Sequence, residues 1–361
     1  MRNVYESLRE AARKPVTEES SYFVNPLTNQ LEKVKLADFE EEKDSSKRRG
    51  CSWTNVYLAT YNNSRFAIKK LTGLAMDSRS DGDRPTKAFE REMTFLRKTT
   101  DWKCDNIVKF HGFIRTGSTA RIILERLDKD LSEVIDSLNK SGIYQRMTEE
   151  SRDIENIGYI ILRDISNGLR YIHGCNSEQE TFMHRDVKAS NIMVKCQEHR
   201  FALIDFGTTK EITVTEENKF HSVGAGQAYY EAPECLEYKP QYCESCDIWS
   251  LGITMIKFVT GKHPIWDEAS DKTSTSNQCV KDNEIHRRIR GKDYDGNTYE
   301  WPIGLTSDFL SQDFKNVINR CVNRNMSERP SAQDIFNIAG SKVNSMDMDS
   351  IKKLFSKFFG D

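Results

Sequence analysis

The chain has 361 residues, of which 37 % are hydrophobic and 30 % are charged, and its formal net charge at pH 7 is -2. This length corresponds to roughly two ordinary domains and is sufficient for a large buried core. The nearly balanced charge provides no global field that would attract nucleic acid or an anionic membrane, so we expect neither as a partner.

The N-terminal sequence is charged from its start and lacks the apolar core of a secretory signal, and no apolar run approaches the ~20 residues that span a bilayer. The nine cysteines are scattered and odd in number, which favours free thiols in a reducing compartment. We therefore expect a soluble cytoplasmic protein, with a nuclear location as the alternative. Cys243 and Cys246 have metal-ligand or redox spacing, but a closed zinc site needs a second pair of ligands.

Residues 1–45 are largely polar and are interpreted as an N-terminal extension or linker. An acidic stretch from Asp38 to Asp44 ends this segment, and the basic residues 47–49 follow it. These three cations fit either a solvated surface, which is the favoured interpretation, or a nuclear address.

Residues 46–127 are interpreted as a small lobe with a hinge at its end. Short strand-like runs lie at 56–59, 65–68, 107–113 and 121–124. The turn signal Asn62-Asn63-Ser64 separates the first two runs and predicts a hairpin. Between the hairpin and the later runs, residues 86–98 place apolar side chains at helical spacing. We expect a small antiparallel sheet with one main helix.

Residues 128–340 are expected to form a larger helical lobe. Six apolar residues define one face of a long helix, namely Ile154, Ile157, Ile161, Ile165, Leu169 and Ile172. The link between the lobes, residues 125–129, is short and mostly polar. The predicted fold class is therefore α+β and bilobal, with the chemistry placed between the lobes.

Two motifs match the needs of phosphoryl transfer, which are metal ions held by oxygen ligands, a cation on the phosphates and an oriented nucleophile. Residues 184–191 read His-Arg-Asp-Val-Lys-Ala-Ser-Asn, and residues 205–207 read Asp-Phe-Gly. A triplet alone has little weight, because such triplets arise by chance and usually mark a turn. Here, apolar strand-like runs beside each motif place Asn191 and Asp205 at the open end of one hairpin.

From about residue 52 to residue 338 the sequence resembles the eukaryotic protein kinase family, of the Ser/Thr type. The resemblance implies that Asp186 accepts the proton of a protein hydroxyl, with Lys188 beside it in the catalytic loop. It also implies that Asn191 and Asp205 bind Mg²⁺, for which Mn²⁺ can substitute. ATP and protein substrates are the expected partners.

The resemblance extends to the smaller lobe. Lys69 matches the lysine that contacts the α- and β-phosphates, and Glu92 matches its helix partner. Lys70 is the neighbouring alternative, but strand alternation places Lys69 on the face of Ala67. The family pattern also implies a pocket for adenine with a gatekeeper at Leu124, formed by Val56, Ala67, Leu124, Glu125, Leu127 and Met193.

Three residues match structural positions of the family. Glu234, in Ala-Pro-Glu, and Arg329 are expected to form a buried ion pair, and Asp247 is expected to begin a buried central helix. Arg185 precedes the catalytic aspartate and resembles the arginine that binds a phosphorylated activation segment. The candidate acceptors are Thr213, Thr215 and Ser222, for which a solvated loop is the plainer interpretation.

The glycine-rich loop departs from the family, because Arg49, Cys51 and Thr54 stand where glycines are usual. Glycines let a backbone approach phosphates closely, so we expect a looser cover over ATP. A second departure is Gln227, where Ser/Thr kinases usually have threonine. The alternative function is thus a pseudokinase that acts by allosteric contact or as a scaffold, although retention of the whole catalytic set favours an active enzyme.

Residues 341–361 alternate apolar and basic side chains as an amphipathic helix does. Its apolar face must be covered. The candidates are the larger lobe, a protein partner and, with the least weight, a membrane surface.

Overall fold

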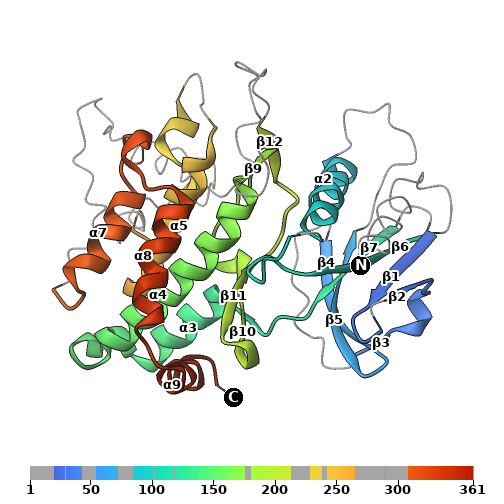
Figure 1. The fold of residues 1–361 in the computed structure, drawn as a ribbon, viewed down its shortest axis with the longest axis horizontal. Helices are drawn as coiled ribbons and strands as arrows, with labels where there is room; N and C mark the ends of the chain where they lie inside the picture. The colour runs from blue at the N-terminus through green and yellow to red at the C-terminus, as the bar shows by residue number, and fades with distance from the viewer. Residues whose placement is uncertain are drawn as a thin grey trace, which may run out of the picture. The chain divides into compact units, whose positions relative to one another are not determined.

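A computed structural model describes residues 20–28, 30–42, 54–71, 84–100, 102–116, 119–174, 180–212, 228–237, 242–264, 289 and 308–360. The described residues form two compact units. The first contains the described residues up to Leu127 together with Asp205–Gly207, and the second contains the described residues from Asp128 to Ile204 and after Gly207. Strands dominate the first unit and helices dominate the second, which confirms the predicted α+β class (Figure 1).

The first unit is built on a seven-stranded sheet with the order β2-β1-β6-β7-β5-β4-β3. Every neighbouring pair in this sheet is antiparallel. The strands are β1 (Ser20–Asn25), β2 (Gln30–Glu32), β3 (Glu40–Glu41), β4 (Thr54–Tyr61), β5 (Ser64–Leu71), β6 (Phe110–Thr116) and β7 (Thr119–Glu125). Helix α2 (Arg84–Thr99) is the main helix of the unit, and its apolar stripe Phe89, Met93 and Leu96 is buried as predicted.

The predicted hairpin is formed by β4 and β5. Its two turn residues, Asn62 and Asn63, have φ angles of 46° and 61°. A two-residue hairpin turn favours positive φ at both positions, and asparagine tolerates this conformation better than most residues. The resulting register places Val56 opposite Lys69.

Residues 20–42 differ from the predicted polar extension, because they supply β1, β2 and β3 of the sheet together with a short 3-10 helix at Leu36–Asp38. Strand β1 pairs with β6, with Tyr22 opposite Phe113. The Phe23 side chain is fully buried, and its ring centroid lies 5.2 Å from that of Phe66. The apolar run that forms β1 is short and flanked by polar residues, so average composition did not reveal it. The sheet of the first unit therefore includes strands from the segment interpreted as an extension.

The second unit is mainly helical. Its helices are α3 (Leu131–Ser141), α4 (Met147–Ile172), α5 (Glu244–Thr260), α7 (Gln312–Cys321), α8 (Ala332–Asn344) and α9 (Met348–Phe359). The six apolar residues predicted for one face of a long helix lie on α4, and all are fully buried. Helix α5 is buried along nearly its whole length, including Trp249 and Asp247, as expected of a central helix.

Short elements connect these helices. The strands are β8 (Lys129–Asp130), β9 (Thr181–Met183), β10 (Ile192–Lys195), β11 (Arg200–Leu203) and β12 (Lys210–Ile212), arranged as a sheet β11-β10-β8 and a pair β12-β9. The 3-10 helices are η2 (Ile143–Arg146), η3 (Ala189–Asn191), η4 (Cys196–Glu198), η5 (Ala228–Tyr230), η6 (Pro233–Leu236) and η8 (Met326–Glu328). Strands β10 and β11 form the hairpin predicted beside the two motifs.

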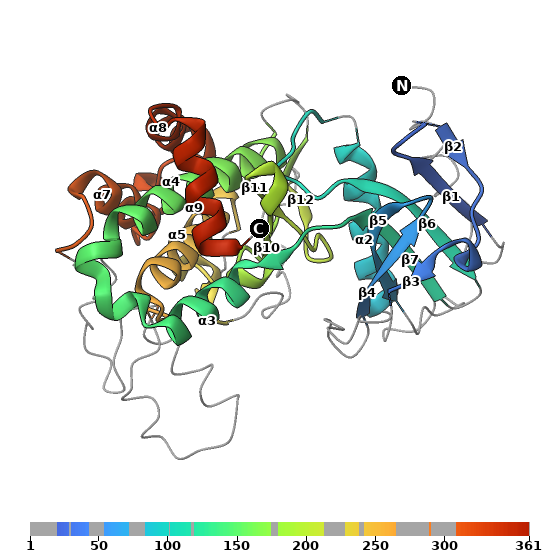
Figure 2. The same ribbon diagram turned by 90° about the horizontal axis from the view of Figure 1, so that it is seen from below.

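The C-terminal tail packs onto the second unit through α9 (Figure 2). The rings of Phe355 and Phe359 lie 5.7 Å and 5.5 Å from that of Phe201 on β11. The Lys129 ammonium donates a hydrogen bond of 2.6 Å to the Phe359 carbonyl at the end of the helix. Of the coverings proposed for this apolar face, the structure shows the chain's own larger unit. Among the described helices, none is long and apolar enough to cross a membrane.

Candidate active site

A lysine and two carboxylates meet in the first unit. The Lys69 ammonium lies 2.8 Å from each oxygen of Glu92 and 2.8 Å from Oδ1 of Asp205. Lys69 and Glu92 are almost fully buried, whereas the Asp205 side chain is 45 % exposed. Alternation along β5 explains the selection of Lys69, because Lys70 points to the other side of the strand.

Electrostatics keep the lysine of this trio charged, whereas burial raises the pKa of Glu92 above its ordinary value. Burial alone would lower the pKa of Lys69, but the carboxylates of Glu92 and Asp205 raise it above its ordinary value. Lys69 is therefore charged at neutral pH. The most exposed member of the trio, Asp205, has carboxylate oxygens, which are hard donors of the kind that Mg²⁺ prefers.

Residue Asp205 is held in its place by its neighbour in the motif. The backbone φ of Asp205 is 63°, a left-handed conformation that is uncommon for residues other than glycine. The Phe206 ring is fully buried and stacks on Phe95 of α2, with 4.6 Å between centroids. The helix that contributes Glu92 therefore also anchors the residue after Asp205.

The residues predicted to contact adenine divide between the two units. Val56, Ala67, Leu124, Glu125 and Leu127 lie in the first unit, and Met193 lies on β10 in the second. Ala67 on β5 lies directly opposite Leu124 on the neighbouring strand β7, so these two residues are adjacent in the sheet. The Glu125 amide N–H donates to the Lys109 carbonyl at 2.9 Å, which means that this donor is already used.

A second set of polar residues meets in residues 184–191 of the larger unit, the segment that resembles the catalytic loop of the family. Oδ2 of Asp186 accepts hydrogen bonds from Lys188 Nζ at 2.7 Å and from Asn191 Nδ2 at 2.8 Å. The same amide nitrogen of Asn191 also donates to the Asp186 carbonyl. Since the Asn191 NH₂ group is directed to Asp186, the amide oxygen is the atom of Asn191 suited to a cation.

The buried carboxylate of Asp247 orders the start of this loop. It accepts hydrogen bonds of 2.9 Å from the backbone N–H groups of His184 and Arg185 and another of 2.9 Å from His173 Nε2. Burial would raise the pKa of Asp247, but the hydrogen bonds from His173 and the backbone lower it below its ordinary value. Asp247 therefore remains ionised, and these contacts satisfy a charge that burial would otherwise make costly.

The imidazole of His184 links the loop to the neighbouring hairpin. Its Nδ1 accepts from the Asp186 N–H at 3.3 Å, so Nε2 carries the proton and donates to the Ile204 carbonyl at 3.1 Å. The Ile204 N–H in turn donates to the Asn191 carbonyl at 3.0 Å. Ile204 directly precedes Asp205 in the chain.

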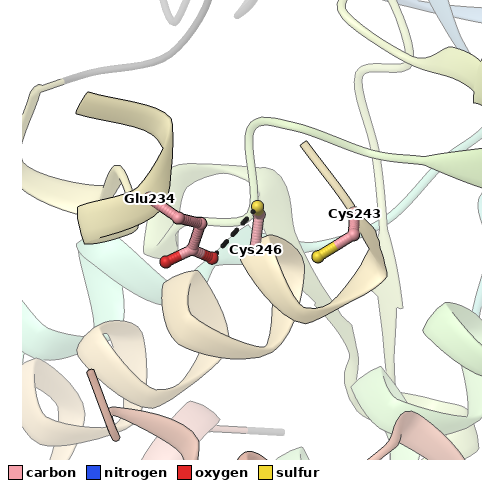
Figure 3. A group of neighbouring side chains, drawn as sticks. All are labelled: Glu234, Cys243 and Cys246. Atoms are coloured by element: carbon pink, nitrogen blue, oxygen red, sulfur yellow. Dashed lines mark hydrogen bonds between the residues drawn. The ribbon is translucent and has the colours of Figure 1, made fainter. Parts of the chain in front are cut away.

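The predicted ion pair of Glu234 and Arg329 is present. The two outer nitrogens of Arg329 donate to the two carboxylate oxygens of Glu234 at 2.6 Å and 2.8 Å. Cys246 also donates to Glu234, at 3.3 Å, and Cys243 lies nearby (Figure 3). Glu234, Cys243 and Cys246 are the one cluster of three His, Cys, Asp or Glu side chains in the described parts of the chain whose ligand atoms all lie within 4.8 Å of one another, but Arg329 engages both carboxylate oxygens.

Several predicted residues lie outside the described residues, namely Thr213, Thr215, Ser222, Gln227, Arg49 and Cys51. Arg185 is described, has a φ of 68° and stacks on the Tyr242 ring at 5.1 Å. Sequence reasoning missed His173 and Phe95. No motif marks either of them, because each acts through a contact with a residue more than 70 positions away.

Comparisons with known proteins identify the family of the chain. Residues 50–339 match the family described as Protein kinase domain. The chain is 26 % identical to a probable myosin light chain kinase of Dictyostelium discoideum over 268 residues, which is 73 % of this chain and 72 % of that protein. It is 29 % identical to mitogen-activated protein kinase kinase kinase 3 of Arabidopsis thaliana over 269 residues, 74 % of this chain.

A third relative is serine/threonine-protein kinase sid1 of Schizosaccharomyces pombe, which is 30 % identical over 176 residues, or 49 % of this chain. The alignments span 37 % of the Arabidopsis protein and 32 % of the Schizosaccharomyces protein. The similarity to these two proteins therefore concerns about a third of their length.

Proposed function

Because the chain belongs to the protein kinase domain family, we propose that it is an ATP-dependent Ser/Thr protein kinase that phosphorylates protein hydroxyls. The observation that carries this proposal is the trio of Lys69, Glu92 and Asp205, in which the lysine and the glutamate are buried and Asp205 is half-exposed. Burying a charged lysine beside carboxylates carries a desolvation cost, so such a group is weak evidence for a role in stability alone and supports a functional role. The named Ser/Thr kinases among its relatives support the acceptor class.

In this proposal, Lys69 contacts the α- and β-phosphates of ATP, and Glu92 holds the ammonium in position. Asp205 and Asn191 are the residues that would hold Mg²⁺, and Mn²⁺ suits the same oxygen donors. The metal supplies neutralisation of the charge on the phosphates. The backbone hydrogen bond between Ile204 and Asn191 supports a common role for the two ligands.

Asp186 orients the acceptor hydroxyl and takes its proton. Its Oδ2 is held by Lys188 and Asn191, so the carboxylate has a defined orientation when the hydroxyl arrives. The Lys188 ammonium lies 2.7 Å from Asp186 and also provides a positive charge beside the reacting groups. Lysine at this place in the loop favours Ser and Thr over Tyr as acceptors.

Regulation through the activation segment is part of the proposal. Arg185 lies in the catalytic loop, directly before Asp186, and would pair with a phosphate on Thr213, Thr215 or Ser222. The cytoplasm, with the nucleus as the alternative, is the proposed location. A pseudokinase that binds partners without transfer remains the second candidate, and the altered glycine-rich loop at Arg49 to Thr54 is the observation that favours it.

The test is transfer from labelled ATP with Mg²⁺ or Mn²⁺ to the chain itself and to a generic basic protein. We expect Lys69→Met and Asp205→Ala to abolish transfer, and Asp186→Asn to lower its rate by about 10²–10⁴-fold, the range for loss of a general base. Lys70→Met is the matched control, because Lys70 lies beside Lys69 on the other side of β5, and it should retain activity.

Equal activity of Lys69→Met and Lys70→Met would contradict the assigned role of Lys69. Absence of transfer from the native chain, even after treatment with an upstream kinase, would favour the pseudokinase. Nucleotide binding measured on the same samples would then distinguish a protein that binds ATP without transfer from one that does not bind it.

A further inference from the structure

Three thiols surround the Glu234–Arg329 ion pair in the larger unit. Cys235 lies on η6, while Cys243 precedes α5 and Cys246 lies in the first turn of that helix. Cys235 and Cys246 are both buried, and their sulfur atoms are 3.2 Å apart. None of the described cysteines forms a disulfide.

We propose that Cys235 and Cys246 are a redox modification site at which a peroxide forms an intramolecular disulfide. A disulfide bond is about 2.05 Å long, so the two sulfurs need to approach by only about 1.2 Å. Cys235 already donates its S–H to Cys246, which orients the two sulfur atoms toward each other. The proposal does not depend on phosphoryl transfer.

The contacts of Cys243 distinguish it from the reacting pair. Its sulfur lies 2.9 Å from the Ser245 hydroxyl and 4.0 Å from the Met326 sulfur. Figure 3 shows Cys243 on the opposite side of Cys246 from Glu234. Cys243 is also a neighbour of Cys246, since their sulfur atoms lie within 4.8 Å of each other. The pairing that we propose is Cys235 with Cys246, because their hydrogen bond of 3.2 Å directs these two sulfur atoms at one another.

A metal site is the less favoured use of these thiols. Structural zinc is held by four ligands in a closed tetrahedral site. The group of Glu234, Cys243 and Cys246 provides three, and the Glu234 carboxylate is bound by Arg329 through both oxygens. A cation would have to displace a buried arginine from its partner, which is energetically unfavourable.

The reaction balances with hydrogen peroxide as the oxidant. The Cys246 thiolate attacks a peroxide oxygen, the O–O bond breaks, and the products are a sulfenic acid and hydroxide. The Cys235 sulfur then attacks the sulfenic sulfur, a hydroxide leaves, and the S–S bond forms. In total, two thiols and one peroxide yield one disulfide and two waters. A dithiol reductant reverses the change by thiol–disulfide exchange.

The environment of Cys246 predicts the pH dependence of this reaction. The hydrogen bond with Cys235, burial and the Glu234 carboxylate raise the pKa of Cys246, and together they outweigh the hydrogen bond with Cys243, which lowers it. Only the thiolate is nucleophilic, so oxidation is slow at neutral pH and faster at higher pH. Once formed, the bond links η6 to α5 and removes the S–H that Cys246 donates to Glu234.

The test treats the full chain with hydrogen peroxide at pH 7 and at pH 9. Intact mass measured without reductant should fall by the mass of two hydrogen atoms, faster at the higher pH, and dithiothreitol should restore it. Peptide mapping of the native chain should recover a linked peptide that contains Cys235 and Cys246. Cys235→Ser and Cys246→Ser should abolish the link, while Cys243→Ser and Cys321→Ser, the latter a buried lone thiol, should retain it.

A linked peptide that joins Cys243 to Cys246, or sulfinic acid without any link, would overturn the proposal. Because the map of the native chain decides this by itself, a variant that fails to fold does not affect the conclusion. Circular dichroism of each variant before oxidation shows whether it is folded.

Discussion

The Asp247 carboxylate accepts a hydrogen bond of 2.9 Å from the backbone N–H of Arg185, a residue with a left-handed φ of 68°. A second oxygen of the same carboxylate accepts from the His184 N–H. The central helix α5 thus holds the backbone of Arg185 in the left-handed conformation, which costs free energy for residues other than glycine. Asp186, the next residue, receives its position from this contact.

The substitution Asp247→Asn should therefore destabilise the chain and lower transfer. Asparagine keeps the size of the side chain but presents an NH₂ group to one of the two backbone donors. Losing a hydrogen bond to a charged group costs about 1.5–3 kcal/mol. Urea denaturation measures the loss, and Asp349→Asn, at an exposed site on α9, should change stability by less than about 0.5 kcal/mol. Equal effects at both sites would contradict the role of Asp247.

Breaking the Glu234–Arg329 pair should be more costly than removing it. Arg329→Met leaves the Glu234 carboxylate buried without its partner, for which we expect a loss of about 3–5 kcal/mol in unfolding free energy. The double variant Glu234→Leu with Arg329→Met leaves no unpaired charge, so its loss should be smaller than the sum of the two single losses. Additive losses in denaturation experiments would show that the two residues are not coupled.

The N-terminal strand β1 should contribute to the stability of the first unit. Phe23→Ala removes a fully buried ring from a core that also contains Phe39 and Phe66, and should cost about 3–5 kcal/mol. Leu27→Ala, at a side chain that is 69 % exposed just after the strand, is the matched control and should be within about 0.5 kcal/mol of the native chain. Similar stabilities of the two variants would indicate that β1 is not part of the core.

The C-terminal helix α9 should contribute to the stability of the second unit through its buried apolar side chains. Phe355→Ala removes a buried ring that contacts Phe201, with an expected cost of about 3–5 kcal/mol, whereas Met348→Ala alters a side chain that is 59 % exposed. Lys357 pairs with Glu150 and Asp153 at partly exposed positions, so Lys357→Ala should cost at most about 1 kcal/mol. Thermal unfolding of the three variants would rank them, and a larger effect at Lys357 than at Phe355 would contradict apolar packing as the main attachment.

Acid should destabilise the chain through His263. Burial, together with the nearby Lys257, lowers the pKa of His263 to about 3. The unfolded chain binds a proton near pH 6.5 that the native chain does not bind, so native stability is complete above pH 6.5 and falls as the pH decreases toward 3. The contribution to the slope is at most about 1.4 kcal/mol per pH unit. The variant His263→Gln should lack this contribution to the pH dependence of stability. Parallel curves of unfolding free energy against pH for the native chain and the variant between pH 7 and 4.5 would contradict the role of His263.

Local patterns determined much of this protein. The period of 3.6 residues located α4 with all six of its apolar residues, and strand alternation selected Lys69 over Lys70. The spacing between Asp186 and Asn191 indicated the loop in which the structure finds them hydrogen-bonded. These features depend on residues close together in the chain, whose geometry is set by the backbone itself.

Tertiary structure decided the remainder. It placed residues 20–42 in the sheet, covered α9 with β11 and brought Cys235 to within 3.2 Å of Cys246. None of these three contacts produces a periodic pattern in the sequence, because each depends on which distant part of the chain the residues meet. The free energy of burial depends on that partner surface, and a linear sequence specifies it only through the complete fold.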